Sequence, residues 1–561
     1  MRYNSSMKRF SFSKANIKEL IIKNQFILYL AVFLIAFFVY LWLQATPTFL
    51  DPDSFYHLKM SKLIAERGPI LNFPWLQFTV LKEYYVDHHF LYHLAAIPFI
   101  KIFGDLPGFK LYTVFLATFF IFFAYVFFRK YKIKYAEIFI LALLFAPAFM
   151  FRISLAKATA FSLIILFLGI YSIFKRRYWL LGLISMLYVW SYGGFVLILL
   201  MAGLFVLADA LQQIFIETPY WFKLKQLSRL AKLKNYAFVF LKNIFRLENI
   251  KLILASWAGV LIGLVLNPYF PKNLLFYWQQ LVQIGIINYR GLVNVGGEWY
   301  PYKLADLAAD SGAAIILGAV SIILFFIFYK RQKAENIFFF LAAMLFFLLT
   351  LKSKRYVEYF MPFLVFFSAF IFKTALTNFN LKEWLQNFKK DSHLIGILIK
   401  VVLIYLAIIF PLLIVKDSYV TKKSYRGGIK FATFSGIAHY LETKTKPGEI
   451  IMHTDWDDFP PLFYYNDKDY YIMGLDPTFM YNYNPDLYNL FADITMAKKA
   501  DNLCQEIRQK FNSSYFIVDA DRPQLAKNLQ NDGNFIKVYE DQDGSIYAAK
   551  DVLGPGTGEI K

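Results

Sequence analysis

Long apolar runs, separated by short polar segments, make up most of the first 418 residues. The runs at 26–43, 111–128 and 313–328 contain no charged residue, and the run at 397–415 contains only Lys400. An α-helix needs roughly 17–25 mostly apolar residues to cross the hydrocarbon core of a bilayer. Several runs reach this length, so the pattern predicts a polytopic α-helical membrane protein.

The apolar runs predict eleven spans, and a total of about eleven to thirteen is expected because some runs are short. The run at 91–102 is either a further span or a re-entrant segment. The first run lacks an obvious small-residue cleavage site, which favours a retained span over a removed signal peptide. The expected spans cover residues 25–45, 109–128, 137–151, 158–174, 178–190, 194–216, 251–270, 313–329, 336–351, 356–373 and 395–416.

Lysine and arginine residues are concentrated in alternate segments between the expected spans. Cytoplasmic loops of membrane proteins carry an excess of these residues, so the pattern places the N-terminus in the cytoplasm. The segments 46–108 and 271–312, and everything after about residue 417, are then expected on the non-cytoplasmic side. The basic segments are Lys8 to Lys23, 129–134, 175–177, 217–250, 330–333 and 382–390.

The last part of the chain, 419–561, is expected to form a soluble domain that follows the membrane domain at 1–418. Short strand-like runs alternate there with helical stretches, and glycine or Asp-Gly pairs fall between them. This alternation predicts a small extracytoplasmic α/β domain. The expected strands cover 449–453, 470–473, 514–518, 535–538 and 545–548, and the expected helices cover 429–442, 486–496 and 501–510.

Composition supports the membrane assignment and argues against other classes. Hydrophobic residues make up 58% of the 561 residues and aromatic residues 20%, which is far more than in ordinary soluble domains. The net charge of +21 belongs to the membrane part, because acidic residues slightly outnumber basic ones after about residue 420. Basic cytoplasmic loops therefore explain the charge better than a nucleic-acid surface does. Cys504 is the only cysteine, so an intrachain disulfide cannot form.

Two acidic segments at the expected membrane boundary are candidates for chemistry. Asp51-Pro52-Asp53 follows the first span directly, and two carboxylates at this spacing can share a divalent cation or orient a nucleophile. The same residues also suit a helix start, with an aspartate cap followed by proline, and both readings stay open. The segment 454–465 groups three carboxylates around Trp456 after a strand-like run, which indicates a site for a polar substrate delivered on a lipid.

Glu298 lies among glycines and aromatic residues in the segment 296–302. This composition suits a loop that closes over a substrate, although the aromatic residues also suit the interface with lipid headgroups. Lys354-Arg355 begins a span on the outer side, where positive charge can bind a lipid-linked phosphate or extend to headgroups. Arg152 and Lys157 invite the same interpretation with less support.

Four histidines, His57, His88, His89 and His93, cluster in the first outer segment. Their spacing matches no specific metal-ligand motif. Structural or hydrogen-bonding roles are therefore favoured over a metal site.

Taken together, these motifs resemble the catalytic subunit of oligosaccharyltransferase, in the GT-C class of lipid-dependent glycosyltransferases. The segment 51–57 is similar to the acidic motif of the family's first outer loop, and 296–301 is similar to the loop that carries its glutamate. Arg355 stands where the family has an arginine for the donor phosphate. The family's tail motif, Trp-Trp-Asp-Tyr-Gly followed by Pro and Tyr-Tyr, aligns with 455–465.

The sequence departs from the family pattern at two places. Asp455 stands where the first tryptophan of the tail motif would be, and Asp458-Phe459 replaces the Tyr-Gly pair. The family's second outer loop supplies an acidic pair for a metal ion, whereas the corresponding segment here contains Arg152 and Lys157. A related transferase is therefore expected. Whether it recognises the standard Asn-x-Ser/Thr sequon or takes another acceptor, and whether it binds the standard metal, stays open.

The resemblance implies an integral membrane glycosyltransferase that moves a sugar or oligosaccharide from a polyprenyl phosphate or diphosphate to a protein or glycan acceptor. Transfer would occur on the non-cytoplasmic face of the cell membrane, with or without a divalent cation (Mg²⁺ or Mn²⁺) as a cofactor. The implied residues are Asp51, Asp53 and Glu298 for catalysis, Asp51 and Glu298 for the metal, Lys354 and Arg355 for the donor phosphate, and Trp456, Asp457 and Asp458 for the acceptor.

Three other functions stay open at this point. A transferase of the same class could use a monophosphate-linked single sugar to modify a lipid or a glycan. A transporter or flippase would carry charged residues deep inside its spans, whereas the candidates here cluster at the outer boundary. A scaffold without catalytic activity would also explain the missing acidic pair.

Overall fold

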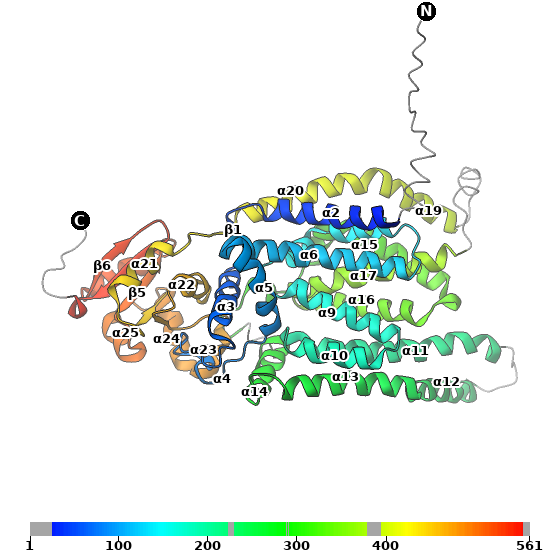
Figure 1. Ribbon diagram of the computed structural model, residues 1–561, viewed down its shortest axis with the longest axis horizontal. Helices are drawn as coiled ribbons and strands as arrows, with labels where there is room; N and C mark the ends of the chain where they lie inside the picture. Colours follow the sequence, from blue (N-terminus) through cyan, green and yellow to red (C-terminus); the bar gives the residue numbers. More distant parts are fainter. Residues whose placement is uncertain (1–24, 223–228, 288, 290, 378–393, 554–561) are drawn as a thin grey trace, which may run out of the picture.

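The computed structural model describes residues 25–222, 229–287, 289, 291–377 and 394–553 (Figure 1). Several basic residues used in the topology argument lie outside these ranges, namely Lys8 to Lys23, Lys223, Lys225 and 382–390. The described residues include all eleven expected spans and the whole predicted sheet.

Helices long and apolar enough to cross a membrane form one bundle, and the described part of the chain contains seven of them. Three shorter apolar helices lie beside them. The seven long helices are α2 (Gln25–Gln44), α6 (Asp105–Lys130), α11 (Val196–Phe222), α13 (Leu247–Val265), α15 (Leu304–Ile327), α16 (Ala334–Lys352) and α17 (Val357–Ala375). The three shorter helices are α5 (Phe90–Phe103), α9 (Thr159–Phe174) and α10 (Tyr178–Val189).

Two further expected spans are bent pairs of helices. The first pair joins α7 (Ala136–Leu144) to α8 (Pro147–Ile153) at an angle of 72°. The second runs from α19 (Leu394–Ile404) into α20 (Phe410–Arg426) and is bent by 48°. Each second helix has a proline in its first turn, where the missing N–H interrupts the helical hydrogen bonds. All eleven expected spans thus coincide with a helix or a bent pair, and the run at 91–102 forms α5.

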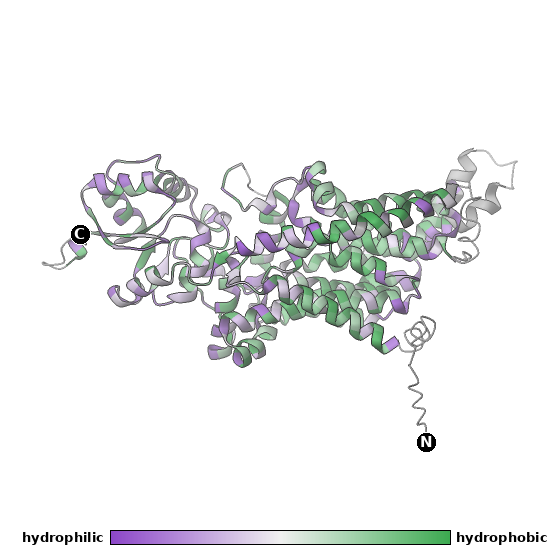
Figure 2. Ribbon diagram, turned by 90° about the horizontal axis from the view of Figure 1, so that it is seen from above, coloured by the Kyte–Doolittle hydropathy of each residue, from purple (hydrophilic) through white to green (hydrophobic). Residues whose placement is uncertain are grey.

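The membrane helices lie side by side along the long axis of the molecule, and the C-terminal domain lies at one end of them (Figure 1). Figure 2 shows hydrophobic residues along these helices and hydrophilic residues mainly in the C-terminal domain. On the outer surface of α13, Leu254, Trp257 and Leu261 are exposed by 62%, 51% and 54%. Large apolar side chains on a surface of this extent face lipid, so the chain is an integral membrane protein.

A layer of short helices lies between the bundle and the C-terminal domain (Figure 1). It contains α3 (Asp53–Arg67), α4 (Leu81–Tyr84) and α14 (Lys272–Trp278). These helices come from the segments 46–108 and 271–312. The two segments therefore share one end of the bundle with the C-terminal domain, as the topology argument requires. Which face of the membrane this end occupies stays a prediction.

The C-terminal domain contains a mixed five-stranded sheet with the strand order β4-β3-β5-β7-β6. β3 pairs in parallel with β4 and β5, and β7 pairs antiparallel with β5 and β6. All five expected strands are present, which confirms the α/β prediction. The strands are β3 (Ile450–Met452), β4 (Tyr470–Tyr471), β5 (Tyr515–Asp519), β6 (Phe535–Glu540) and β7 (Gly544–Ala549). The helices are α21 (Ser435–Lys444), α22 (Phe459–Tyr465), α23 (Pro477–Tyr483), α24 (Pro485–Thr495), α25 (Leu503–Phe511) and α26 (Pro523–Asp532).

The structure differs from expectation at the start of this domain. The helix expected from residue 429 begins at Ser435 as α21, and residues 429–430 instead form the short strand β2 (Ile429–Lys430). β2 pairs antiparallel with β1 (Thr48–Phe49), which follows the first membrane helix. Sequence periodicity could not show this pairing, because β1 lies at the other end of the membrane domain.

Candidate active site

A cavity of about 340 Å³ lies where the helix bundle, the short-helix layer and the C-terminal domain meet. It brings together six of the eight site residues expected from sequence, namely Asp51, Asp53, Glu298, Arg355, Trp456 and Asp457. Further polar residues on its wall are His57, His88, His89, Arg152, Lys157, Tyr192 and Asp476. Residues from distant parts of the chain therefore converge on one polar cavity.

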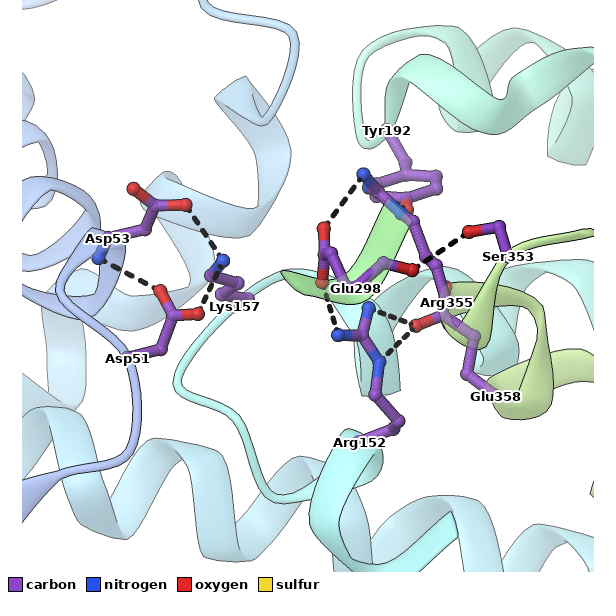
Figure 3. A network of polar contacts seen from close by, with 9 residues as sticks. All are labelled: Asp51, Asp53, Arg152, Lys157, Tyr192, Glu298, Ser353, Arg355 and Glu358. Carbon is purple, nitrogen blue, oxygen red and sulfur yellow. Dashed lines mark hydrogen bonds and ion pairs between the residues drawn. The ribbon is translucent and has the colours of Figure 1, made fainter. Parts of the chain in front are cut away.

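The two aspartates of the first outer segment form one side of the cavity with Lys157. Oδ1 of Asp51 accepts a hydrogen bond from the backbone N–H of Asp53 at 2.9 Å, at the start of α3. The other oxygen of each aspartate faces Lys157, whose Nζ lies 2.8 Å from Asp51 and 2.7 Å from Asp53 (Figure 3). The motif therefore starts helix α3 and also presents two carboxylates to the cavity.

A second cluster of charged residues, centred on Glu298, forms the opposite side (Figure 3). One carboxylate oxygen of Glu298 is paired with Arg152, and the other lies 3.2 Å from Nη1 of Arg355. Arg152 also donates two hydrogen bonds, of 2.7 and 3.0 Å, to the fully buried Glu358. Nη2 of Arg355 donates to the hydroxyl of Tyr192 at 2.9 Å. Glu298 is thus the anion held between two arginines.

Backbone contacts fix the loop that carries Glu298 against the start of α17. Oγ of Ser353 donates to the backbone carbonyl of Glu298 at 2.8 Å, and the N–H of Lys354 donates to the carbonyl of Tyr300 at 2.9 Å. The guanidinium of Arg355 lies 4.9 Å from the centre of the Trp299 ring, a favourable cation–π arrangement. The loop is therefore held against the start of α17, with Glu298 on the cavity wall.

Trp456 and Asp457 enter the cavity from the C-terminal domain. The indole N–H of Trp456 donates to the backbone carbonyl of Asn294 at 3.2 Å. The backbone N–H of Asn294 donates to the hydroxyl of Tyr488 at 3.1 Å. These two contacts connect the C-terminal domain to the Glu298 loop. The tail motif therefore forms one wall of the same cavity as the aspartates.

Asp458 does not line this cavity, although the sequence places it beside Asp457. Its Oδ2 accepts hydrogen bonds from the N–H of Asp455 at 2.7 Å and from the hydroxyl of Thr454 at 3.1 Å. This is a capping box that starts the short helical turn at 456–458. The carboxylate of Asp458 is turned back to its own backbone, which leaves it unable to contact an acceptor in the cavity.

Lys354 also lies outside the main cavity and lines an adjacent one of about 440 Å³. This second cavity shares Arg152 and Glu298 with the first. Membrane helices form much of its remaining wall, with Ala148 on α8, Val357 on α17 and Thr421 on α20, and Tyr302 and Asp310 line it as well. The arginine–glutamate cluster thus separates a polar cavity from one that is bordered by membrane helices.

The carboxyl groups of the site have different pKa values, because their surroundings differ. Burial alone would raise the pKa of Glu298, but the nearby Arg152, Arg355 and Lys157 hold it well below its usual value. Burial raises the pKa of Asp53 to about 6, against the effect of Lys157. Burial, together with the charges of Asp53 and Asp51, raises the pKa of Asp457 to about 9. At neutral pH the cavity therefore holds an ionised Glu298 and an un-ionised Asp457.

Two of the four histidines of the first outer segment, His57 and His93, form a hydrogen-bonded chain with Asp87. Nδ1 of His57 lies 2.8 Å from Nε2 of His93, and Nδ1 of His93 lies 2.8 Å from Oδ2 of Asp87. His57 lines the cavity, whereas His93 and Asp87 are almost fully buried. Burial and neighbouring imidazoles hold the pKa of His57 well below its usual value. The hydrogen-bonding role favoured from the sequence therefore agrees with the geometry.

Sequence reasoning missed Tyr192, Glu358 and Asp87. Glu358 follows Arg355 by three residues at the start of an apolar span, and an acidic residue at such a position signals a partner inside the protein. Tyr192 precedes Gly193-Gly194 between two apolar runs, but nothing in the pattern points from it to Arg355.

The charges of the site do not fit a divalent cation between Asp51 and Glu298. Each of these carboxylates is already paired, the first with Lys157 and the second with Arg152 and Arg355. Mg²⁺ requires near-octahedral oxygen coordination, and fixed positive groups nearby oppose a further cation. Within the described ranges, no three His, Cys, Asp or Glu side chains are grouped as metal ligands.

Comparison with known proteins reveals similarity in structure but not in sequence. No family model and no curated protein sequence matches the chain. The archaeal oligosaccharyltransferase AglB from Archaeoglobus fulgidus, in complex with an inhibitory peptide and a dolichol-phosphate, matches with a TM-score of 0.59 at 12% identity, over 95% of this chain and 75% of that chain. The apo form of the Archaeoglobus fulgidus oligosaccharyltransferase gives a TM-score of 0.58 at 13% identity, over 93% and 74%.

A second kind of glycosyltransferase matches as well. The arabinofuranosyltransferase AftD from mycobacteria has a TM-score of 0.53 at 10% identity, over 94% of this chain and 40% of that chain. These matches cover both the helix bundle and the C-terminal domain of the present protein. At such identities the likeness is one of fold, and the chain is a divergent protein with the GT-C-like fold of these glycosyltransferase structures.

Proposed function

We propose that the protein is a membrane glycosyltransferase that uses a sugar or oligosaccharide linked to a polyprenyl phosphate or diphosphate. The observation that carries this proposal is the convergence of Asp51, Asp53, Glu298 and Arg355 on one cavity at the end of the membrane bundle. The shared fold with an oligosaccharyltransferase and an arabinofuranosyltransferase supports it.

The donor would reach the site through the second cavity, which is bordered by α8, α17 and α20. A polyprenyl chain suits a wall of membrane helices, while its phosphate suits the cationic side chains of Lys354 and Arg152 that line this cavity. Arg355 lies on the main cavity, on the other side of Glu298. Arginine binds phosphate through paired donors in a planar fork. Dolichol-phosphate, a lipid of this class, is bound in the Archaeoglobus structure.

The reaction requires a base for the acceptor and stabilisation of the leaving phosphate. The acceptor nucleophile would lose its proton to Asp51 or Asp53 as it forms a bond to the anomeric carbon of the sugar. The bond from that carbon to the phosphate oxygen then breaks, and negative charge increases on the departing lipid phosphate. Arg355 would stabilise this charge, because fixed cations placed where charge develops lower the barrier.

The acceptor would lie against Trp456 and Asp457 on the C-terminal domain. The raised pKa of Asp457, about 9, leaves its carboxyl group able to donate a hydrogen bond at neutral pH. The segment that carries these two residues differs from the family's tail motif at the neighbouring Asp455 and Asp458-Phe459, so we infer an acceptor other than the standard sequon. A protein, a glycan and a lipid are the classes to be compared.

One experiment tests the function directly. The purified full-length protein is incubated with polyprenyl-phosphate and polyprenyl-diphosphate sugars carrying a radiolabel, together with peptide, glycan and lipid acceptors. Label that moves to an acceptor supports the proposal and identifies the donor class. Label that stays on the lipid, but crosses the bilayer of liposomes containing the protein, would establish a flippase instead.

A further inference from the structure

The ammonium group of Lys157 lies between the two aspartates of the first outer segment. It is 2.8 Å from Oδ2 of Asp51 and 2.7 Å from Oδ2 of Asp53. The Lys157 side chain is only 17% exposed, and it reaches the aspartates from the segment between α8 and α9. A single positive centre therefore contacts one oxygen of each carboxylate, which is the arrangement of a cation ligated by both.

We propose that Lys157 is a built-in cation that replaces a divalent metal ion at Asp51 and Asp53, so that sugar transfer by this protein does not require a metal. The proposal rests on the glycosyltransferase function proposed above. Lys157 acts through the two carboxylates and is a positioning residue for them.

The two aspartates need a positive partner because they face the same cavity at close range. Like charges at this separation repel each other, and burial penalises both ionised forms. Burial raises the pKa of Asp53 to about 6 even though Lys157 lowers it. Lys157 supplies this partner, because its ammonium group contacts one oxygen of each carboxylate.

Lys157 also remains charged at physiological pH. Burial alone would lower its pKa, but Asp51, Asp53 and Glu298 raise it above the ordinary lysine value. A dication at the aspartates would have to approach this ammonium group or displace it. The third carboxylate, Glu298, offers no free ligand because it is held by Arg152 and Arg355.

Direct binding of Mn²⁺ to the full-length protein tests the proposal without any substrate. Electron paramagnetic resonance of the purified wild-type protein should show no saturable Mn²⁺ site at the aspartates. Lys157→Ala should create such a site, because a positive charge has been removed. The affinity of this variant for Mn²⁺ should exceed the residual affinity of the wild type by about tenfold or more. Adding Asp51→Asn to that variant should abolish the new site. Lys527→Ala, on the exposed surface of α26, is the matched control and should behave as wild type.

Two results would overturn the proposal. One is a single Mn²⁺ bound per wild-type chain and lost in Asp51→Asn. The other is a folded Lys157→Ala protein that binds Mn²⁺ no better than wild type. If Lys157→Ala does not fold, the wild-type titration decides together with Lys157→Arg, which keeps the charge and should still exclude Mn²⁺.

Transfer activity gives an independent reading. Wild-type transfer should be unchanged by a chelator, and Lys157→Ala should lose roughly 100-fold in kcat through misplaced carboxylates. Mn²⁺ should restore part of that loss over the concentration range of the new binding site. If a chelator abolishes wild-type transfer, the proposed role of Lys157 is wrong but the glycosyltransferase function stands. If Mn²⁺ binding behaves as expected but neither the wild type nor any variant transfers sugar, the glycosyltransferase function is wrong instead.

Discussion

Arg152 in α8 and Glu358 in α17 form a buried ion pair, with Nη2 of the arginine 2.7 Å from Oε2 of the glutamate. The Glu358 side chain is fully buried, and the Arg152 side chain is 9% exposed. The same guanidinium contacts Glu298 in the cavity. One arginine thus connects the packing of two membrane helices to the geometry of the site.

Removing the arginine should destabilise the protein as well as impair the site. Arg152→Met leaves Glu358 buried without a partner, a change that typically lowers the free energy of unfolding by about 3–5 kcal/mol. Adding Glu358→Gln should recover part of the loss, because the second change removes the unpaired charge. Thermal unfolding in detergent measures both effects. Arg67→Met, at a side chain that is 58% exposed, should change stability by no more than about 1 kcal/mol.

Asp51→Asn and Asp53→Asn should each lower transfer by roughly 100-fold or more, because base catalysis at the acceptor is lost. Expression and thermal stability should stay close to wild type. Labelled-sugar transfer measures the activity, and Asp521→Asn, at an 81% exposed side chain, is the control. Full activity in Asp51→Asn and Asp53→Asn would remove these carboxylates from the mechanism.

The raised pKa of Asp457 predicts a pH-dependent contribution to stability. The carboxyl titrates near pH 4 in the unfolded chain and at about 9 in the folded protein. Between these values the folded state holds a proton that the unfolded state has lost. The free energy of unfolding should therefore fall as pH rises from about 4 to 9, by at most about 1.4 kcal/mol per pH unit.

Asp457→Asn isolates this contribution, since an amide has the shape of the un-ionised acid and does not titrate. Thermal unfolding of wild type and variant at pH 6, 8 and 10 should show a difference that grows with pH. At pH 7 the variant should keep transfer activity within a few-fold of wild type. Parallel pH profiles for the two proteins would contradict an un-ionised Asp457.

Trp456→Phe keeps an aromatic ring in the cavity wall but removes the N–H that reaches Asn294. Loss of one such hydrogen bond is worth about 1 kcal/mol, so the Glu298 loop should open more often. Amide hydrogen exchange over 291–299 should quicken, and KM for the acceptor should rise about fivefold. Trp179→Phe, at a lipid-facing residue that is 74% exposed, should leave exchange there unchanged.

The sequence predicted those features that local pattern determines. Each expected span and each expected strand of the C-terminal domain is present, because apolar periodicity follows from which faces are buried. The motifs that converge on the cavity were found through acidic and basic residues at span boundaries. Their roles in catalysis stay predictions.

Features that depend on side-chain direction or on distant packing could not be predicted in the same way. Lys354 and Arg355 are adjacent, yet they line different cavities. Asp457 faces the main cavity while Asp458 caps a turn. The partnership of Lys157 with Asp51 and Asp53 joins segments more than 100 residues apart, and composition alone gave no reason to pair them.

The β1–β2 pairing sets the earliest moment at which the site can be complete during biosynthesis. Thr48, three residues before Asp51, pairs with Lys430. The cavity also includes Trp456 and Asp457. The ribosome must therefore translate every membrane span before the first aspartates gain their final neighbours. Stalled or truncated chains therefore carry Asp51 and Asp53 without the assembled cavity.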